Sequence, residues 1–139
     1  MGKKAFKDGN FKTARDYFEL TLKEAKESGN KAFEGIVYNN LGRAYKSLGE
    51  VRKAIEFFQL SLTIATETGN KHGKGTVYNN LGSAYKSLGE VRKAIEFYQL
   101  SLTIATETGN KDGKGTVYNN LGSAYKSLGE VRKAIEFFQ

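Results

Sequence analysis

Two stretches of 40 residues in this chain repeat one another almost without change. Residues 41–80 read LGRAYKSLGEVRKAIEFFQLSLTIATETGNKHGKGTVYNN, and residues 81–120 follow in the same register without a gap. The two copies differ at three positions. Arg43, Phe58 and His72 of the first copy correspond to Ser83, Tyr98 and Asp112 of the second. The register extends back to Met1 and forward to Gln139. Self-similarity at a fixed period of this length predicts a repeat architecture, in which each copy buries its apolar face against its neighbours.

The length of the chain fits one short array of such copies. We expect a single domain over residues 1–139 of the 139-residue chain. Its expected parts are a partial first repeat (1–30), two full copies (31–70 and 71–110) and a last copy cut within its second helix (111–139). The near-identity of the later copies indicates recent duplication or an engineered array. Copies cut at both ends indicate an excised or designed segment, with apolar ends through which it could self-associate.

Within each copy the apolar residues follow a helical period, which predicts two amphipathic helices, at 32–48 and 51–68 in the first full copy. The apolar stripe of the first helix is Val37, Tyr38, Leu41, Ala44, Tyr45 and Leu48. The stripe of the second is Val51, Ala54, Ile55, Phe58, Leu62 and Ala65. A further apolar set lies on the second helix, at Phe57, Leu60 and Ile64. This set predicts a second cover, from the first helix of the next copy.

The chain has 16 Gly and no Pro, so we expect glycine to mark its helix ends and turns. Gly49 and Gly69 follow the last apolar residues of the two helices, where a left-handed C-terminal position favours glycine. Gly42 lies inside the first helix, where it costs about 1 kcal/mol relative to alanine. We therefore expect a close approach of the two helices, with Gly42 opposite a small residue such as Ala54.

Composition removes most enzyme classes. There is no cysteine, so disulfides, thiolate nucleophiles and cysteine metal sites are absent. The single histidine, His72, cannot form a histidine cluster, and we interpret it as a solvated loop residue. The glycine-rich stretch at 71–75 lacks the strand and the Lys-Ser/Thr ending of a P-loop. We expect no catalytic site, no metal and no cofactor.

Charge and hydropathy restrict the partners. The chain has 22 Lys+Arg and 15 Asp+Glu, a formal charge of +7, which favours acidic partners at moderate salt. No stretch approaches the 18 consecutive apolar residues of a membrane span, and no apolar signal segment follows the N-terminus. We expect a cytoplasmic protein with no membrane partner.

Each copy also carries aromatic, Leu-Gly, aromatic, Gly, Ala, aromatic and small residues at fixed spacing. The first set is Tyr38, Leu41, Gly42, Tyr45, Gly49, Ala54, Phe58 and Ser61. The second is Tyr78, Leu81, Gly82, Tyr85, Gly89, Ala94, Tyr98 and Ser101, and a third begins at Tyr118, Leu121, Gly122, Tyr125, Gly129, Ala134 and Phe138. This pattern resembles the tetratricopeptide repeat, and its 40-residue form resembles the repeats of the G-protein-signalling-modulator (Pins-type) group. The resemblance implies an all-α fold of helix-turn-helix repeats stacked as a right-handed solenoid. It also implies a concave groove, lined by the first helices, that holds a peptide.

The polar residues beside the apolar stripe of each first helix are the candidate peptide-binding residues. They are Asn39, Asn40, Arg43 and Lys46; Asn79, Asn80, Ser83 and Lys86; and Asn119, Asn120, Ser123 and Lys126. A row of asparagines offers donors and acceptors to the backbone of an extended peptide. The lysine row and Arg43 favour carboxylates, so we expect an acidic peptide from a protein partner.

Other interpretations remain open for the same residues. Some asparagine side chains could instead bond to the neighbouring helix and hold the repeats together. The whole chain could be a structural or engineered array with no ligand of its own. A third interpretation is a basic solenoid that binds nucleic acid through phosphate contacts, with a steep salt dependence. Nucleobase stacking on the tyrosine rows is disfavoured, because these rings fall on the predicted core stripes.

Overall fold

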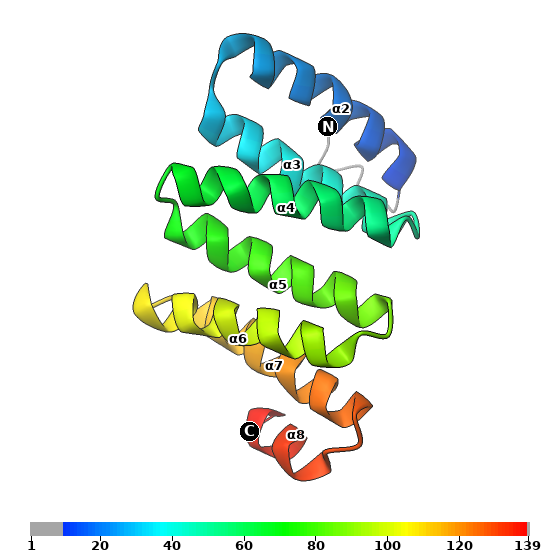
Figure 1. Cartoon of the computed structure of the whole chain (residues 1–139), viewed down its shortest axis with the longest axis vertical. Coiled ribbons are helices and arrows are strands. Elements are labelled where there is room, and N and C mark those ends of the chain that lie inside the picture. Colours follow the sequence, from blue (N-terminus) through cyan, green and yellow to red (C-terminus); the bar gives the residue numbers. More distant parts are fainter. Residues whose placement is uncertain (1–9, 139) are drawn as a thin grey trace. The chain divides into compact units, whose positions relative to one another are not determined.

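The computed structural model describes residues 10–138, without the side chains at 131, 132 and 134. Every regular element in this range is an α-helix (Figure 1). The chain divides after Asn70 into two compact units, unit 1 before this point and unit 2 after it. Unit 1 contains α2 (Phe11–Ser28), α3 (Lys31–Ser47) and α4 (Val51–Glu67). Unit 2 contains α5 (Lys71–Ser87), α6 (Val91–Glu107), α7 (Lys111–Ser127) and α8 (Val131–Phe138).

Consecutive helices pack against one another within each unit. In unit 1, α3 packs against both α2 and α4. In unit 2, α6 packs against α5 and α7, α7 packs against α8, and α5 also touches α7. We call α3, α5 and α7 the A helices, because they are the first helices of the copies, and α2, α4, α6 and α8 the B helices. The all-α fold of stacked helix-turn-helix repeats that the sequence predicts is confirmed.

The predicted helix boundaries agree with the structure to within one residue, and glycine ends the helices as expected. Gly49 and Gly69 adopt φ values of +85° and +68°. The N–H of Gly49 donates to the carbonyl of Lys46 at 3.0 Å, and the N–H of Glu50 donates to that of Tyr45 at 2.9 Å. These two bonds form a Schellman motif, which satisfies carbonyls that the helix end leaves without partners.

Asparagines that follow glycine begin the next helix, a role that the sequence reasoning missed. The side chain of Asn30 accepts a hydrogen bond from the N–H of Phe33 at 3.1 Å, and that of Asn110 accepts one from the N–H of Gly113 at 2.9 Å. Asparagine is among the preferred residues at this position, so the Gly-Asn pairs close one helix and open the next. Residues 71–75 accordingly belong to α5. The interpretation of His72 as a loop residue is wrong, since it lies in the first turn of that helix with its side chain exposed.

The close approach predicted at Gly42 is present, but its predicted neighbour is wrong. A Cβ atom built on Gly42 would overlap the ring of Phe58, and not a small residue such as Ala54. In unit 2, a Cβ on Gly82 would lie 2.6 Å from the ring of Tyr98. The glycine therefore makes room for a large aromatic ring from the B helix, which packs directly against the backbone of the A helix.

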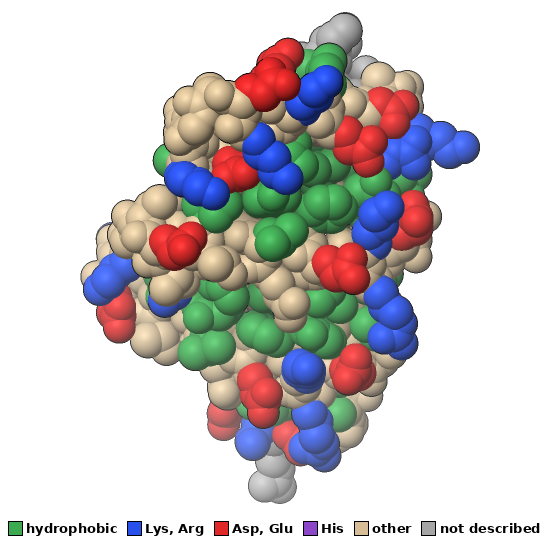
Figure 2. All heavy atoms as spheres, turned by 45° about the horizontal axis from the view of Figure 1, so that its top comes forward, with side chains coloured by type: hydrophobic (Ala, Val, Ile, Leu, Met, Phe, Trp, Pro, Cys, Tyr) green, Lys and Arg blue, Asp and Glu red, His purple; other side chains and the backbone are tan. Residues whose placement is uncertain are grey.

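The core follows the predicted stripes, whereas the second apolar set behaves differently from the prediction. Leu41, Ala44, Ala54 and Phe58 are fully buried. The prediction that the next copy covers this set is wrong at Leu100, the equivalent of Leu60 within unit 2, because 46% of this side chain is exposed. Figure 2 shows hydrophobic side chains gathered between charged ones on one face of the molecule.

Phe57, another residue of that apolar set, packs on the A helix of its own copy instead. The ring of Phe57 stacks on Tyr45, with centroids 5.3 Å apart, and on Tyr38, with centroids 6.0 Å apart. Lys53 lies 4.7 Å from the centroid of Tyr45, and Lys26 lies 5.8 Å from that of Tyr38. These lysines lie within the range of cation–π attraction. The same stack recurs in unit 2, so the tyrosine rows are packing residues, as predicted.

Candidate functional site

The polar face of the A helices in unit 2 brings four of the predicted residues together. The Nδ2 atom of Asn120 on α7 donates to Oδ1 of Asn79 on α5 at 2.8 Å. Further along the same two helices, the ammonium group of Lys86 donates to the hydroxyl of Ser123. The two bonds join α5 to α7 directly. They support the interpretation in which polar residues of this face hold neighbouring repeats together, and they also fix the orientation of groups that face outward.

The asparagines pair one position out of step with the predicted row. Asn120 is equivalent to Asn80, but the hydrogen bond between α5 and α7 reaches Asn79. Asn80 is half-buried, whereas Asn119 is exposed. An amide that makes one hydrogen bond keeps further donors and acceptors, so the pair still presents polar groups on this face.

Ser83 has a different partner from the one the groove interpretation suggests. Its hydroxyl lies 3.0 Å from the hydroxyl of Tyr98 on α6. Burial raises the pKa of Tyr98, and the hydrogen bond with Ser83 acts in the opposite direction. Ser83 therefore connects the polar face of α5 to the buried aromatic ring behind it.

The remaining candidates are divided between the two units. Lys126 on α7 is exposed. In unit 1, α3 presents Arg43, which is exposed, and the half-buried residues Asn39, Asn40 and Lys46. The rows that would run from Asn40 to Asn80 and from Lys46 to Lys86 join different units, and they stay predictions.

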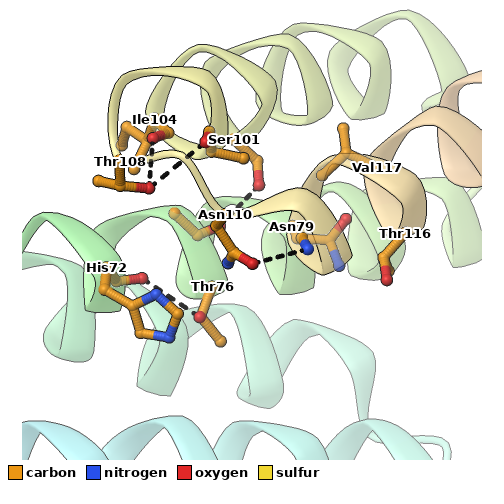
Figure 3. A pocket seen from close by; sticks show the side chains of 12 residues that line it. His72, Thr76, Asn79, Ser101, Ile104, Thr108, Asn110, Thr116 and Val117 are labelled. Atoms are coloured by element: carbon orange, nitrogen blue, oxygen red, sulfur yellow. Dashed lines mark hydrogen bonds between the residues drawn. The ribbon is translucent and has the colours of Figure 1, made fainter.

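A cavity of about 180 Å³ opens in unit 2 between α5, the end of α6 and the beginning of α7 (Figure 3). Asn79, Thr76 and Thr116 line it, and these residues lie on the polar stripe of the A helices. The sequence reasoning missed the contribution of α6, which supplies Ile104 and Ala105. The sequence carries no clear signal for the cavity, because a glycine in its lining serves close packing: a Cβ built on Gly75 would lie 3.0 Å from the side chain of Ile104.

The aromatic stack of unit 1 does not form an open ligand surface. The stacked rings of Tyr38, Phe57 and Tyr45 cover one another, and lysines lie over the outer faces of the stack. A nucleobase has no open ring face to stack on there. Within residues 10–138, His, Asp and Glu form no group of three that could hold a metal ion. Among the described helices, none combines the length and apolar character needed to cross a bilayer.

The tetratricopeptide repeat family model matches residues 4–67 and 69–139. The chain therefore belongs to the tetratricopeptide repeat family, and the resemblance read from the aromatic and Leu-Gly spacing is confirmed. The likeness to the Pins-type repeats and an engineered origin stay predictions. No curated protein sequence matches the chain.

Solved structures of the same architecture are similar to this chain. One contains the nearly identical repeats of a putative kinesin light chain from Podospora anserina, with a TM-score of 0.83 and 20% identity, covering 98% of this chain and 67% of that one. The tetratricopeptide domain of Arabidopsis FLU has a TM-score of 0.74 and 24% identity, covering 78% of this chain and 91% of that one.

A third solved structure contains a bound peptide. It is the Rap conjugation gene regulator of the plasmid pLS20 in complex with the Phr* peptide, with a TM-score of 0.88 and 17% identity. The similarity covers 99% of this chain and 38% of that one. Identities this low show a shared fold. The role of that fold in this chain has to be argued from its own residues.

Proposed function

We propose that this protein is a non-enzymatic cytoplasmic scaffold that binds an extended, acidic peptide segment of a protein partner along the polar face of its A helices. The observation that carries the proposal is the cavity between α5 and α7, which opens beside the Asn79–Asn120 pair on this face. The family consists generally of non-catalytic scaffolds, and one protein of the same fold has been solved with a peptide bound.

The asparagine pair suits the backbone of an extended peptide. Oδ1 of Asn79 accepts from Asn120, which leaves the Nδ2 group of Asn79 as a donor and the Oδ1 atom of Asn120 as an acceptor. A peptide group needs one donor and one acceptor opposite its own carbonyl and N–H. The pair therefore holds both kinds of group close together, oriented by a bond between the two helices.

The cationic residues of the A helices favour carboxylates. Lys86 donates to Ser123, which holds its ammonium group along the face, and an ammonium group has three donors in all. Lys126 is exposed on the neighbouring helix. Arg43, on α3 of unit 1, adds a planar guanidinium that suits a carboxylate. These groups, together with the net charge of +7, favour an acidic ligand over a basic one.

Selection from a library of short random peptides displayed on phage tests this proposal. Peptides are selected on the native chain and counter-selected on a variant carrying Asn79→Ala and Asn120→Ala, after circular dichroism shows that both are folded. We expect the enriched sequences to be acidic. Enrichment of basic sequences, or retention of the same peptides by both proteins, would contradict the proposal.

The affinity of a selected peptide is then measured by fluorescence anisotropy in two charge-matched variants. Lys86→Gln with Lys126→Gln removes two charges from the A-helix face, and Lys12→Gln with Lys23→Gln removes two exposed charges from α2. We expect the affinity to fall about tenfold in the first variant and less than about twofold in the second. Lysines that contact the peptide act strongly on its carboxylates, whereas salt screens the more distant lysines of α2. Equal losses would indicate unspecific attraction to a basic protein.

A second candidate function, self-association, is favoured by the exposed side of α8. Ile135 and Phe138 are 50% and 52% exposed, whereas the equivalent Ile95 and Tyr98 of α6 are 8% and 2% exposed. Contiguous apolar surface of this kind is typical of protein contacts. Light scattering over a wide concentration range tests this candidate. The apparent mass should rise with concentration in the native chain and stay constant in Phe138→Glu.

A further inference from the structure

The cavity in unit 2 is large enough to enclose a side chain rather than a single water molecule. Its volume is about 180 Å³, whereas a water molecule occupies about 30 Å³ in the liquid and a dry cavity of roughly 150 Å³ can hold benzene. The buried residues Ala105 and Val117 form part of its wall, and the exposed residues Thr76 and Thr116 stand at its opening (Figure 3).

The hydroxyl groups around the cavity are already satisfied by the protein backbone. Each donates to a main-chain carbonyl: Thr76 to His72 at 3.2 Å, Ser101 to Gly75 at 2.8 Å, Thr108 to Ile104 at 2.9 Å, and Thr116 to Asp112 at 3.1 Å. A water molecule in a protein cavity needs two to four polar partners to be held well. Threonines whose hydroxyls bond to their own helix offer mainly their methyl groups to a guest. A lining that reads as polar in the sequence is therefore largely apolar in its chemistry.

Three polar side chains remain in the lining, the imidazole of His72 and the amides of Asn79 and Asn110. Oδ1 of Asn79 accepts from Asn120, which leaves the side-chain nitrogen of Asn79 as a donor toward a ligand beside the asparagine pair. Ile104 and Ala105, on α6, contribute apolar side chains to the same lining. A ligand that fits both has an apolar branch beside an amide, which is the chemistry of one residue of a peptide.

We infer that the cavity between α5, α6 and α7 takes one apolar side chain, branched aliphatic or phenyl, of the bound peptide, while the asparagine pair holds the backbone beside it. This inference rests on the proposed peptide-binding function and adds a specificity to it. The acidic residues of the peptide contact the lysines, and the residue at the cavity is apolar. Burying such a side chain favours binding through the hydrophobic effect, and a carboxylate in the same place would lose its hydration.

The first test uses blocked single amino acids, so that it does not depend on a peptide ligand. N-acetyl-leucinamide and N-acetyl-glycinamide are titrated into the native chain while methyl signals of Ile104, Ala105 and Val117 are followed by NMR. Thr116→Phe should plug the opening. Thr103→Phe is the matched control, because Thr103 is also exposed and donates to a carbonyl one turn back at 3.1 Å, but does not line the cavity.

We expect the leucine probe to shift these methyl signals in the native chain and in Thr103→Phe, and to leave them unmoved in Thr116→Phe. The glycine probe should shift none of them. Equal shifts from both probes, no shifts from either, or shifts that survive the plug would each overturn the inference.

The second test varies one position of a selected acidic peptide among Gly, Ser, Glu, Leu and Phe. At one position, we expect the peptide with Leu or Phe to bind about tenfold more tightly than the peptide with Gly. This gain should vanish in Thr116→Phe and persist in Thr103→Phe. Peptides that bind with no apolar preference would overturn the inference and leave the proposed function intact. Binding of the leucine probe by a chain that selects no acidic peptide would overturn the proposed function and leave an apolar cavity.

Discussion

The α3–α4 pair of unit 1 and the α5–α6 pair of unit 2 share one apolar framework and differ in their polar contacts. In both pairs an aromatic ring of the B helix packs against a glycine of the A helix, Phe58 on Gly42 and Tyr98 on Gly82. In unit 2 the added hydroxyl of Tyr98 meets Ser83 at 3.0 Å. Two of the three differences between the copies, at 43/83 and 58/98, therefore fall on one contact. The two copies therefore differ in a polar contact between the helices, and both keep the glycine and the aromatic ring that set the distance between the helices.

The junctions between a B helix and the next A helix show the same contrast. In unit 1 the hydroxyl of Tyr45 donates to the carboxylate of Glu19 on α2. In unit 2 the amide of Gln99 on α6 donates to the hydroxyl of Tyr125 at 3.4 Å. One tyrosine position is thus held by a charged acceptor in one unit and by a neutral donor in the other.

The largest expected effect comes from breaking the shared framework. Gly42→Ala and Gly82→Ala each place a Cβ within overlap distance of an aromatic ring. We expect both to lower the free energy of unfolding by about 3 kcal/mol, since overpacking a rigid core is costly. Urea unfolding followed by circular dichroism measures the loss. If one site tolerates alanine and the other does not, the frameworks are not equivalent.

Gly115→Ala is the control for those two substitutions. Gly115 lies inside α7, and a Cβ there would meet no heavy atom within 4 Å. We expect a gain of up to about 1 kcal/mol from helix propensity. A loss at this position as well would mean that alanine harms these helices for a reason other than ring contact.

Alkaline pH should weaken the Tyr45 junction. Burial, followed by the hydrogen bond to Glu19, raises the pKa of Tyr45 from 10.0 to about 12. Below pH 10 the tyrosine is protonated in both states, and between pH 10 and 12 only the unfolded chain releases its proton. The free energy of unfolding should therefore fall across this window, by about 1 kcal/mol once solvent screening of the hydroxyl is allowed for.

Urea unfolding at about pH 8 and about pH 11.5 measures this loss in matched variants. Tyr45→Phe should reduce it, Tyr17→Phe at an exposed ring should not, and Glu19→Gln should reduce it in part, because the neutral amide resembles the Gln99–Tyr125 junction. An unchanged loss in Tyr45→Phe would assign the alkaline sensitivity to other groups.

A smaller effect is expected where the copies differ by one hydroxyl. Ser83→Ala and Tyr98→Phe should each cost about 1 kcal/mol, and the double variant should cost little more than either one, because the two groups share one hydrogen bond. A double-mutant cycle of urea unfolding gives the coupling energy. Additive losses would show that the bond at 3.0 Å contributes nothing of its own.

The fold could be predicted nearly in full because periodicity and glycine placement act locally. Helix ends at Gly49 and Gly69 follow from the preference of left-handed positions for glycine. The reason for Gly42 could not be completed from the sequence. Phe58 lies 16 positions away on another helix, and the crossing geometry decides which side chain faces the glycine.

The sequence predicted which face of the A helices carries the candidate site, but not which residues of that face contact one another. The polar stripe of the A helices does contain two hydrogen-bonded pairs, Asn79 with Asn120 and Lys86 with Ser123. The period of the repeat predicts rows of equivalent residues, whereas the hydrogen bond between α5 and α7 joins Asn120 to Asn79 and not to its equivalent Asn80. The cavity was missed because it depends on α6, whose residues read as core, and on threonine rotamers that turn hydroxyls toward the backbone.

The smallest predicted effect concerns the lysines over the outer tyrosines. Lys74 lies 6.0 Å from the ring of Tyr78 on its own helix, while in unit 1 Lys26 of α2 lies 5.8 Å from the ring of Tyr38. Both gain a weak cation–π attraction, but Lys26 is in the last turn of its helix and Lys74 is in the first. A positive charge is favourable near a helix C-terminus and unfavourable near an N-terminus. We therefore expect Lys26→Gln to cost about 0.5 kcal/mol and Lys74→Gln about zero in urea unfolding, with the difference between them shrinking in high salt. Equal losses would mean that the ring contact, rather than the position along the helix, decides what these lysines contribute.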